Sequence, residues 1–175
     1  YLIEFLLFSK FYIYQYLILN TMKTTITELL DSKGMKYRLL PHDKEVFTCE
    51  DAARERNVPL SEMVKCMLLV DASYEYFLIC CTADKRVDTK KVQELLDCSR
   101  LSFASQEEIE NVLGYKMGAI PPLLLKTEIK VVFDKLIKEK EKVNISSGDP
   151  AAGLELGSKE LIELVDPVVG DVAED

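Results

Sequence analysis

The sequence has little of three things on which common chemistries depend: histidine, paired cysteines and basic charge. His42 is the only histidine, which excludes most hydrolytic triads built on that residue. The five cysteines show neither metal-ligand spacing nor a secreted-scaffold pattern, and with a single histidine they argue against a zinc site. A net charge of -8 argues against broad neutralisation of nucleic-acid phosphates, so any nucleic-acid contact must be local.

Length and cysteine usage set the broad class of the protein. The 175 residues suit a single domain with a real hydrophobic core, and no repeat or low-complexity segment interrupts them. The cysteines are odd in number and three of them lie within apolar runs, which indicates reduced thiols and a cytoplasmic protein. No cofactor is predicted.

The long hydrophobic run is confined to residues 1–20. Three polar residues interrupt it, no small-residue cleavage site follows, and Met22 stands just before a predicted helix. A start at Met22 is therefore favoured over a membrane anchor. We expect residues 1–21 to be a non-native or disordered extension, residues 22–165 to form the functional domain and residues 166–175 to be an acidic tail that frays.

Hydrophobic periodicity alternates between helix and strand along the functional domain. Capping patterns such as Ser105 to Glu108 mark where helices begin. Short strands joined partly by turns and partly by helices favour an α+β domain over a doubly wound one, with one mixed, curved and barrel-like sheet and flanking helices. The predicted helices are 24–33, 48–57, 88–97, 158–165 and one from 105, and the predicted strands are 35–40, 65–70, 76–82, 100–104, 129–133, 143–146 and 153–156.

Lys65 opens the apolar run Lys65-Cys66-Met67-Leu68-Leu69-Val70 and is the first candidate for function. A run of this kind is typical of a central strand buried on both faces, where an ammonium group is costly unless the fold uses it. The alternative is that the stem packs at the mouth of the strand and the amine stays in water.

Two loops are candidates for contact with a ligand. In Gly114-Tyr115-Lys116-Met117-Gly118-Ala119-Ile120-Pro121-Pro122, two glycines and a proline pair predict a rigid loop whose backbone N–H groups can approach a small oxygen-rich group. Ile145-Ser146-Ser147-Gly148-Asp149 ends a strand in a turn that carries hydroxyl and N–H groups. The alternatives are a plain connection for the first loop and a solvent-facing turn for the second.

Taken in order, these elements resemble the YbaK/prolyl-tRNA-editing family, whose members hydrolyse mischarged aminoacyl-tRNA. The matching pieces are the Thr48 helix, Val64-Lys65, Val87-Asp88 with Lys90-Lys91-Val92, Gly114-Tyr115 with Gly118-x-x-x-Pro122, and Ile145-Ser146-x-Gly148 followed by Leu154-Glu155-Leu156. The resemblance implies that Lys65 is the essential lysine. It also implies that the substrate is bound by Gly114, Tyr115, Gly118, Ala119, Ile120, Pro122, Ser146 and Gly148.

The chain departs from the cysteine-specific members of that family at two places. Leu40 stands where they carry a tyrosine, which argues against cysteine specificity. Asp149-Pro150-Ala151 replaces a basic pair and a glycine, which removes positive charge near the end of the tRNA. The expected partners are a mischarged aminoacyl-tRNA, bound through its terminal aminoacyl-adenosine, and an aminoacyl-tRNA synthetase, with no membrane partner.

The expected reaction is hydrolysis of the ester between an amino acid and the terminal ribose, with Cys or Ala on tRNA(Pro) as the first substrates to test. It requires a positioned nucleophile and donors for the oxyanion that develops. Lys65 can anchor a phosphate or ribose as a cation, which we favour, or act as a base after losing its proton. The nucleophile would be water, the neighbouring ribose hydroxyl or a substrate thiol. Two other functions stay open: a non-catalytic module that binds a tRNA end or a synthetase, and a thiol-dependent redox protein.

Overall fold

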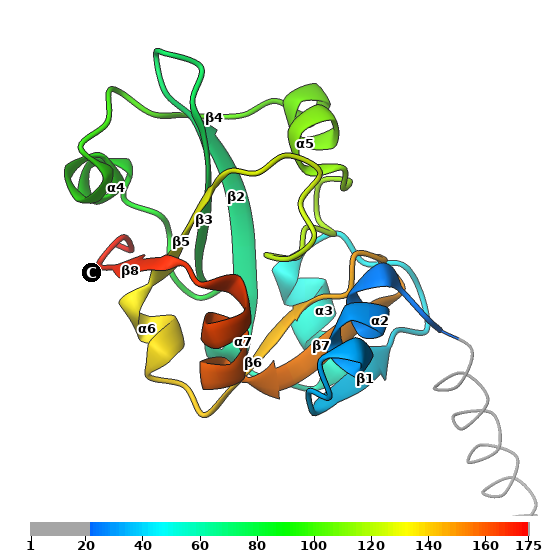
Figure 1. Cartoon of the computed structure of the whole chain (residues 1–175). Coiled ribbons are helices and arrows are strands. Elements are labelled where there is room, and N and C mark those ends of the chain that lie inside the picture. Colours follow the sequence, from blue (N-terminus) through cyan, green and yellow to red (C-terminus); the bar gives the residue numbers. More distant parts are fainter. Residues whose placement is uncertain (1–21, 175) are drawn as a thin grey trace, which may run out of the picture.

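The structure is a computed structural model that describes residues 22–174 (Figure 1). The expected extension at residues 1–21 lies outside the described residues. The helices are α2 (Thr25–Ser32), α3 (Cys49–Arg56), α4 (Thr89–Leu96), α5 (Gln106–Leu113), α6 (Lys135–Lys138) and α7 (Ser158–Val165), with a short 3-10 helix η1 (Leu60–Glu62) after α3.

The strands form two sheets. The smaller sheet is antiparallel, with the order β1-β7-β6, and the larger sheet has the order β4-β2-β3-β5-β8. Figure 1 shows α2 and the smaller sheet at one end of the molecule and α4 with β8 on the opposite side. The strands are β1 (Tyr37–Pro41), β2 (Val64–Val70), β3 (Tyr76–Thr82), β4 (Ser102–Phe103), β5 (Lys130–Asp134), β6 (Lys142–Ser146), β7 (Ala152–Gly157) and β8 (Val168–Gly170).

The larger sheet mixes antiparallel and parallel pairing, as predicted for an α+β domain. β2 and β3 form an antiparallel hairpin, whereas β3–β5 and β5–β8 pair in parallel. The two sheets meet at a single parallel bridge between Met63 and Asn144. The α+β class is confirmed, but the strands described here divide between two sheets and form no closed barrel, so the barrel-like curvature is not confirmed.

Helix starts follow the local sequence closely. Ser105 caps α5 by accepting from the Glu108 N–H, and the Glu108 carboxylate accepts from the Ser105 N–H in return. Thr48 caps α3 in the same way by accepting from the Asp51 N–H at 3.1 Å. The start of α3 is therefore determined locally, and the cavity described below borders this helix.

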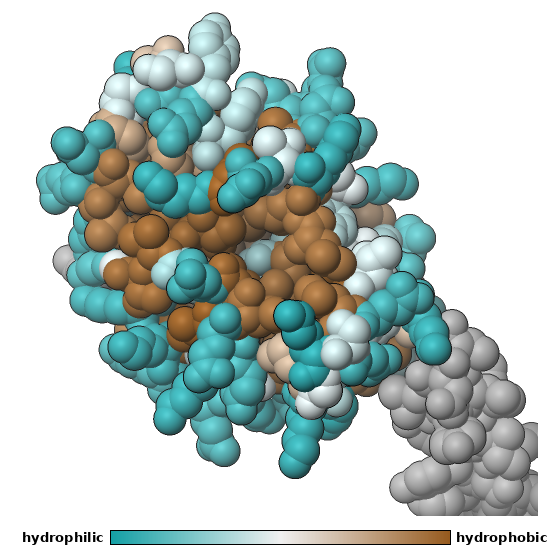
Figure 2. All heavy atoms as spheres, viewed as in Figure 1, coloured by the Kyte–Doolittle hydropathy of each residue, from teal (hydrophilic) through white to brown (hydrophobic). Residues whose placement is uncertain are grey.

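The main hydrophobic core lies between the two sheets and their helices. Leu78 and Phe133 from the larger sheet pack there with Ile145 and Leu154 from the smaller one, and all four are fully buried. Figure 2 shows further hydrophobic residues gathered across the middle of one face, between hydrophilic margins. This shared core holds the two sheets together, and the cavity lies where their ends meet.

The C-terminal segment corrects one prediction. Residues 166–174 were expected to fray, but β8 pairs with β5 and Val172 is fully buried. The buried Asp134 carboxylate accepts the N–H groups of Val172 and Ala173 at 2.9 and 3.0 Å. These charge-assisted hydrogen bonds and the added strand hold the segment in the fold.

The helices in the described part of the chain are too short and too polar to span a membrane.

Candidate active site

The loop around Gly118 is held against the segment that precedes α3. Gly118 has a φ of +87°, a conformation that favours glycine, and a Cβ added to it would lie 2.6 Å from the Phe47 carbonyl oxygen. Only glycine therefore allows the two backbones to approach this closely. The sequence predicted that bare backbone in this loop would approach a ligand, whereas the close contact that requires Gly118 in the structure is with the protein's own backbone.

A small cavity of about 80 Å³ lies beside this contact. It brings together four residues predicted from sequence as one site, Lys65, Gly118, Ile120 and Ser146. They come from β2, from the glycine loop and from the end of β6, so both sheets contribute. The remaining lining residues are Phe47, Thr48, Cys49, Ala52, Arg56, Met63, Val64 and Cys66.

Lys65 is half-buried and is tied to the turn that follows β3. Its Nζ donates to the carbonyl oxygen of Ala83 at 3.3 Å and also to the carbonyl oxygen of Lys85. An ammonium group has three N–H donors, so these two carbonyl acceptors leave one donor available for a ligand. The side chain therefore has a defined position in the wall of the cavity.

The other predicted residues lie behind the cavity wall. Ala119 and Pro122 are buried, and Gly114 ends α5 in the left-handed conformation. The Tyr115 hydroxyl donates to the Leu123 and Leu124 carbonyl oxygens, at 3.2 Å each. A Cβ on Gly148 would lie 3.0 Å from the Tyr115 ring. These residues hold the glycine loop in place but do not themselves line the cavity.

The glycine loop offers two backbone donors from residues that line the cavity. The Ala119 N–H donates to the Lys116 carbonyl oxygen at 3.0 Å, whereas the N–H groups of Gly118 and Ile120 have no acceptor among residues 22–174. Pro121 and Pro122 follow and carry no N–H, and among the loop residues that line the cavity the free N–H groups are those of Gly118 and Ile120. Paired backbone donors of this kind are suited to binding an oxyanion.

Arg56 is a site residue that sequence reasoning missed. Its Nε donates to His42 Nε2 at 3.0 Å, and its Nη1 donates to the Ile145 carbonyl oxygen at 3.1 Å and to Met63 Sδ at 3.7 Å. Burial lowers the pKa of Arg56 to about 10, so the guanidinium stays charged at neutral pH. The cavity wall therefore contains a second cation.

His42, which directly follows β1, is the side chain that accepts the hydrogen bond from Arg56. Its Nδ1 lies 2.9 Å from the Pro150 carbonyl oxygen, to which it donates, and its Nε2 accepts from Arg56. Burial lowers the pKa of His42, and the nearby Arg56 charge acts in the same direction. The neutral tautomer with the proton on Nδ1 is the form that fits both contacts.

The cysteines near the cavity are poor nucleophiles. Burial raises the pKa of Cys49 and Cys80, and it raises the pKa of Cys81 to about 12. The Cys80 thiol donates to Cys66 Sγ at 3.3 Å. Protonated thiols are weak nucleophiles at neutral pH, so the geometry gives no support to covalent thiol chemistry at these positions.

In the same described part of the chain, no three His, Cys, Asp or Glu side chains are grouped so that they could hold a metal ion.

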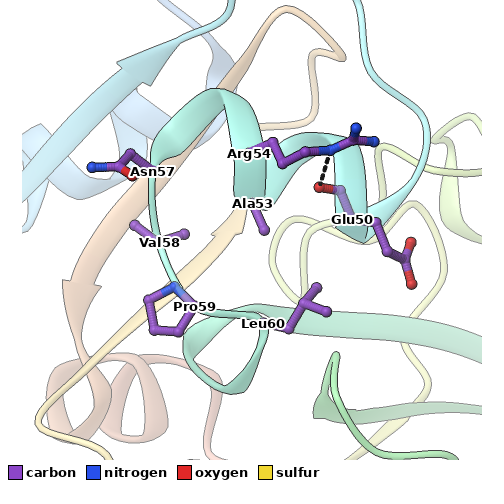
Figure 3. A pocket seen from close by; sticks show the side chains of 7 residues that line it. All are labelled: Glu50, Ala53, Arg54, Asn57, Val58, Pro59 and Leu60. Carbon is purple, nitrogen blue, oxygen red and sulfur yellow. Dashed lines mark hydrogen bonds between the residues drawn. The ribbon is translucent and has the colours of Figure 1, made fainter.

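A second, larger hollow of about 620 Å³ lies along a different face of α3, and we call it the outer groove (Figure 3). None of the residues predicted from sequence lies in it. Arg54 crosses it and donates from Nε to the Glu50 carbonyl oxygen at 3.5 Å. Its lining residues are Glu50, Ala53, Arg54, Asn57, Val58, Pro59 and Leu60.

Comparison with known proteins decides the family. Residues 43–164 match the model of the aminoacyl-tRNA editing domain, and this range contains every lining residue of the cavity. The chain belongs to the aminoacyl-tRNA editing domain family. The predicted resemblance is thereby confirmed.

Two curated relatives and two solved structures extend this finding. The prolyl-tRNA editing protein ProX of Acetoanaerobium sticklandii is 28% identical over 82% of this chain and 90% of its own length. The multifunctional Ser/Thr-tRNA deacylase ProXp-y of Escherichia coli is 28% identical over 64% of this chain and 68% of its own.

The first solved structure, described only as a hypothetical protein, is 30% identical with a TM-score of 0.80, over 86% of this chain and all of its own. The second, described as a candidate trans-editing enzyme for prolyl-tRNA synthetase, has a TM-score of 0.75 at 23% identity, over 89% of this chain and all of its own, and supports the fold alone.

Proposed function

We propose that the protein is an aminoacyl-tRNA deacylase that acts in trans, hydrolysing the ester of a mischarged tRNA in the small cavity. One observation carries the proposal: the Lys65 side chain and the glycine loop with its two unpaired N–H groups border the same cavity. The names of the relatives, an editing protein and a deacylase, support the same reaction.

In the proposed reaction the cavity takes the aminoacyl group and the terminal ribose lies at its mouth. The Gly118 and Ile120 N–H groups stabilise the oxyanion that forms when the ester carbonyl is attacked. Lys65 acts as a cation that holds the terminal phosphate or ribose, since its two carbonyl contacts leave one ammonium N–H for such an oxygen. The nucleophile is water or the neighbouring ribose hydroxyl, since the buried thiols are protonated.

The exposed Phe47 ring supports binding of the tRNA end. It borders the cavity and is 51% exposed, so part of the ring is available for contact with a ligand. Stacking on an aromatic face is the general way in which proteins bind an unpaired base. We assign this position to the terminal adenine, so that the contact with nucleic acid stays local, as the net charge of -8 requires.

The substrate we favour is a small amino acid on tRNA(Pro), because the cavity has room for roughly two or three water molecules. The relatives include the proline–tRNA ligase of Aquifex aeolicus, of which the match covers 19%. This supports a prolyl-tRNA synthetase as the partner that supplies the mischarged tRNA. The reaction belongs to translation, which assigns the protein to the cytoplasm.

A deacylation panel tests the proposal. Purified protein is mixed with tRNA(Pro) charged in separate reactions with Ala, Cys, Ser, Thr and Pro, and release of the amino acid is followed against spontaneous hydrolysis. We expect release of at least one small amino acid and no release of proline. Tight binding of the charged tRNAs with no release of any amino acid would contradict the deacylase and favour the non-catalytic module.

A further inference from the structure

We propose that Arg56 is a specificity-determining residue that selects aminoacyl groups with a small side chain ending in an oxygen acceptor, such as a hydroxyl. The inference rests on the proposed deacylase function and names the substrate class of the same cavity. Four features carry it: the fixed position of the guanidinium, its open edge, the lack of a carboxylate around it, and the size of the space.

The guanidinium is held from three sides. His42 accepts from Nε, and the Ile145 carbonyl oxygen and Met63 Sδ accept from Nη1. A Cβ added to Gly153 would lie 1.9 Å from Arg56 Cζ, so the guanidinium lies directly over the bare backbone of β7. A planar group fixed in this way loses little further freedom when it binds a ligand.

The Nη2 edge of the guanidinium is open. Among the described residues no hydrogen-bond acceptor for Nη2 is present, since the contacts of Arg56 involve Nε and Nη1 only. Nη2 is also absent from the buried polar side-chain atoms that lack a partner, which are Glu62 Oε2 and the two amide atoms of Asn144. Nη2 is therefore not completely buried, although it lies over the Gly153 backbone, where an added Cβ would be 2.3 Å away, and Arg56 borders the cavity. An incoming acceptor can use its two N–H groups.

The charge of Arg56 is uncompensated. The lining residues of the cavity include no carboxylate, and Arg56 takes part in none of the ion pairs of the described residues. A half-buried cation without an anion is costly to the fold. Such a cost is repaid when a ligand supplies an oxygen that accepts a charge-assisted hydrogen bond.

The volume of the cavity limits the length of the side chain on the substrate amino acid. A space of about 80 Å³ holds a hydroxymethyl group together with the α-carbon region, and it excludes aromatic and long aliphatic side chains. Seryl and 2-aminobutyryl groups are the best probes, because they are nearly the same size and differ only in a terminal hydroxyl against a methyl.

The test compares release of these two amino acids from the same tRNA(Pro), as the ratio of their kcat/KM values, for wild type, Arg56→Met and Arg54→Met. Arg54 lies two residues away on the same helix and is 77% exposed, so its variant is the matched control for loss of charge. A structural role of Arg56 alone would lower both rates equally and leave the ratio unchanged.

We expect wild type to prefer the seryl ester at least tenfold, the size of one hydrogen bond to a charged group. Arg56→Met should reduce the ratio at least tenfold, and Arg54→Met should keep it. An unchanged ratio in Arg56→Met, or no seryl preference in wild type, overturns the inference. If Arg56→Met does not fold, the same ratio is measured for Arg56→Lys. It should also fall at least tenfold, because one ammonium group cannot bind His42 and the ligand at the same time.

A binding measurement separates this inference from the deacylase itself. Hydrolysis-resistant 3′-amide analogues of seryl-adenosine and 2-aminobutyryl-adenosine are titrated into the same proteins by calorimetry. If no ester is hydrolysed but the seryl analogue binds at least tenfold more tightly in an Arg56-dependent way, the deacylase fails and the specificity role stands. Equal binding of the two analogues to wild type would contradict the role of Arg56.

Discussion

The two faces of helix α3 differ in a way that separates a built site from a hollow surface. The inner face presents Arg56 to a cavity of about 80 Å³, and the outer face presents Arg54 to a groove of about 620 Å³. Arg56 is held by a histidine and a carbonyl oxygen from two other elements. Within residues 22–174, the hydrogen bonds of Arg54 go to residues of its own helix, Asp51 and Glu50.

Size is therefore a poor guide to function in this protein. The smaller space has fixed cations, unpaired N–H groups and walls from both sheets, whereas the larger one is bordered only by α3 and the segment that directly follows it (Figure 3). Preorganised polar groups bind and stabilise charge without reorganisation, and a shallow groove beside exposed side chains cannot.

The largest effect is expected from a substitution in the glycine loop that lines the small cavity. In Gly118→Ala the new Cβ would meet the Phe47 carbonyl oxygen in a left-handed conformation, so we expect a loss of about 2 to 4 kcal/mol in unfolding free energy and at least a hundredfold loss of deacylation. Gly34→Ala is the matched control, since Gly34 also has a positive φ but nothing within 4 Å. It should cost about 1 kcal/mol and keep full activity. Equal effects in the two variants would contradict the close-contact role of Gly118.

A second substitution, Gly153→Ala, is expected to move the Arg56 side chain while leaving Arg56 itself in the sequence. Gly153→Ala puts a methyl group where the Arg56 guanidinium lies, so we expect deacylation to fall about tenfold through loss of its fixed position. Gly157→Ala on the same strand meets the end of the flexible Glu160 side chain and should be tolerated. Steady-state rates on one charged tRNA measure the difference, and a larger loss in Gly157→Ala would count against the assignment.

Acid should weaken the contact between His42 and Arg56. The pKa of His42 is lowered in the folded protein, so the unfolded chain binds the extra proton more readily, and stability present above pH 6.5 is lost as pH falls through the lowered pKa. The groups that face the ring are the Arg56 guanidinium and the carboxylates of Glu55 and Asp149. Urea unfolding from pH 7.5 to 5.5 measures this slope. His42→Gln keeps an acceptor that does not titrate, so the unfolding free energy of this variant should depend less on pH. An identical pH dependence in the variant and wild type would refute the role of His42.

The smallest effect is expected in the outer groove. Arg54→Leu removes an exposed cation whose contacts lie within its own helix, so deacylation should change by less than twofold and stability by about 0.5 kcal/mol. Loss of most activity in this variant, with a folded protein by circular dichroism, would move the site to the outer groove.

Four of the twelve residues that line the cavity, Lys65, Gly118, Ile120 and Ser146, could be predicted from the sequence because they stand in locally distinctive patterns. Few sequences place a lysine at the start of an apolar strand or follow two glycines with a proline pair, so both patterns are informative. Lys65 and Gly118 border the same cavity in the structure. The capping residues Thr48 and Ser105 likewise give the starts of their helices, since each caps through contacts within four residues.

The rest depends on tertiary contacts that local patterns do not show. Arg54 and Arg56 stand in the same charged stretch of α3, and only the fold determines which one faces His42. The acidic end of the chain resembles a fraying tail, but β8 is held by β5 and by the buried Asp134, which lies more than thirty residues earlier. The division into two sheets also depends on long-range pairing.

The central claim is that the small cavity is where the ester is cleaved, and Lys65 tests it most directly. Release of an amino acid from mischarged tRNA(Pro) is measured for Lys65→Ala and for Lys138→Ala, an exposed lysine on α6. The account predicts at least a hundredfold slower release in Lys65→Ala, with an unchanged fold by circular dichroism, and full activity in Lys138→Ala. Release at the wild-type rate by folded Lys65→Ala would contradict the account.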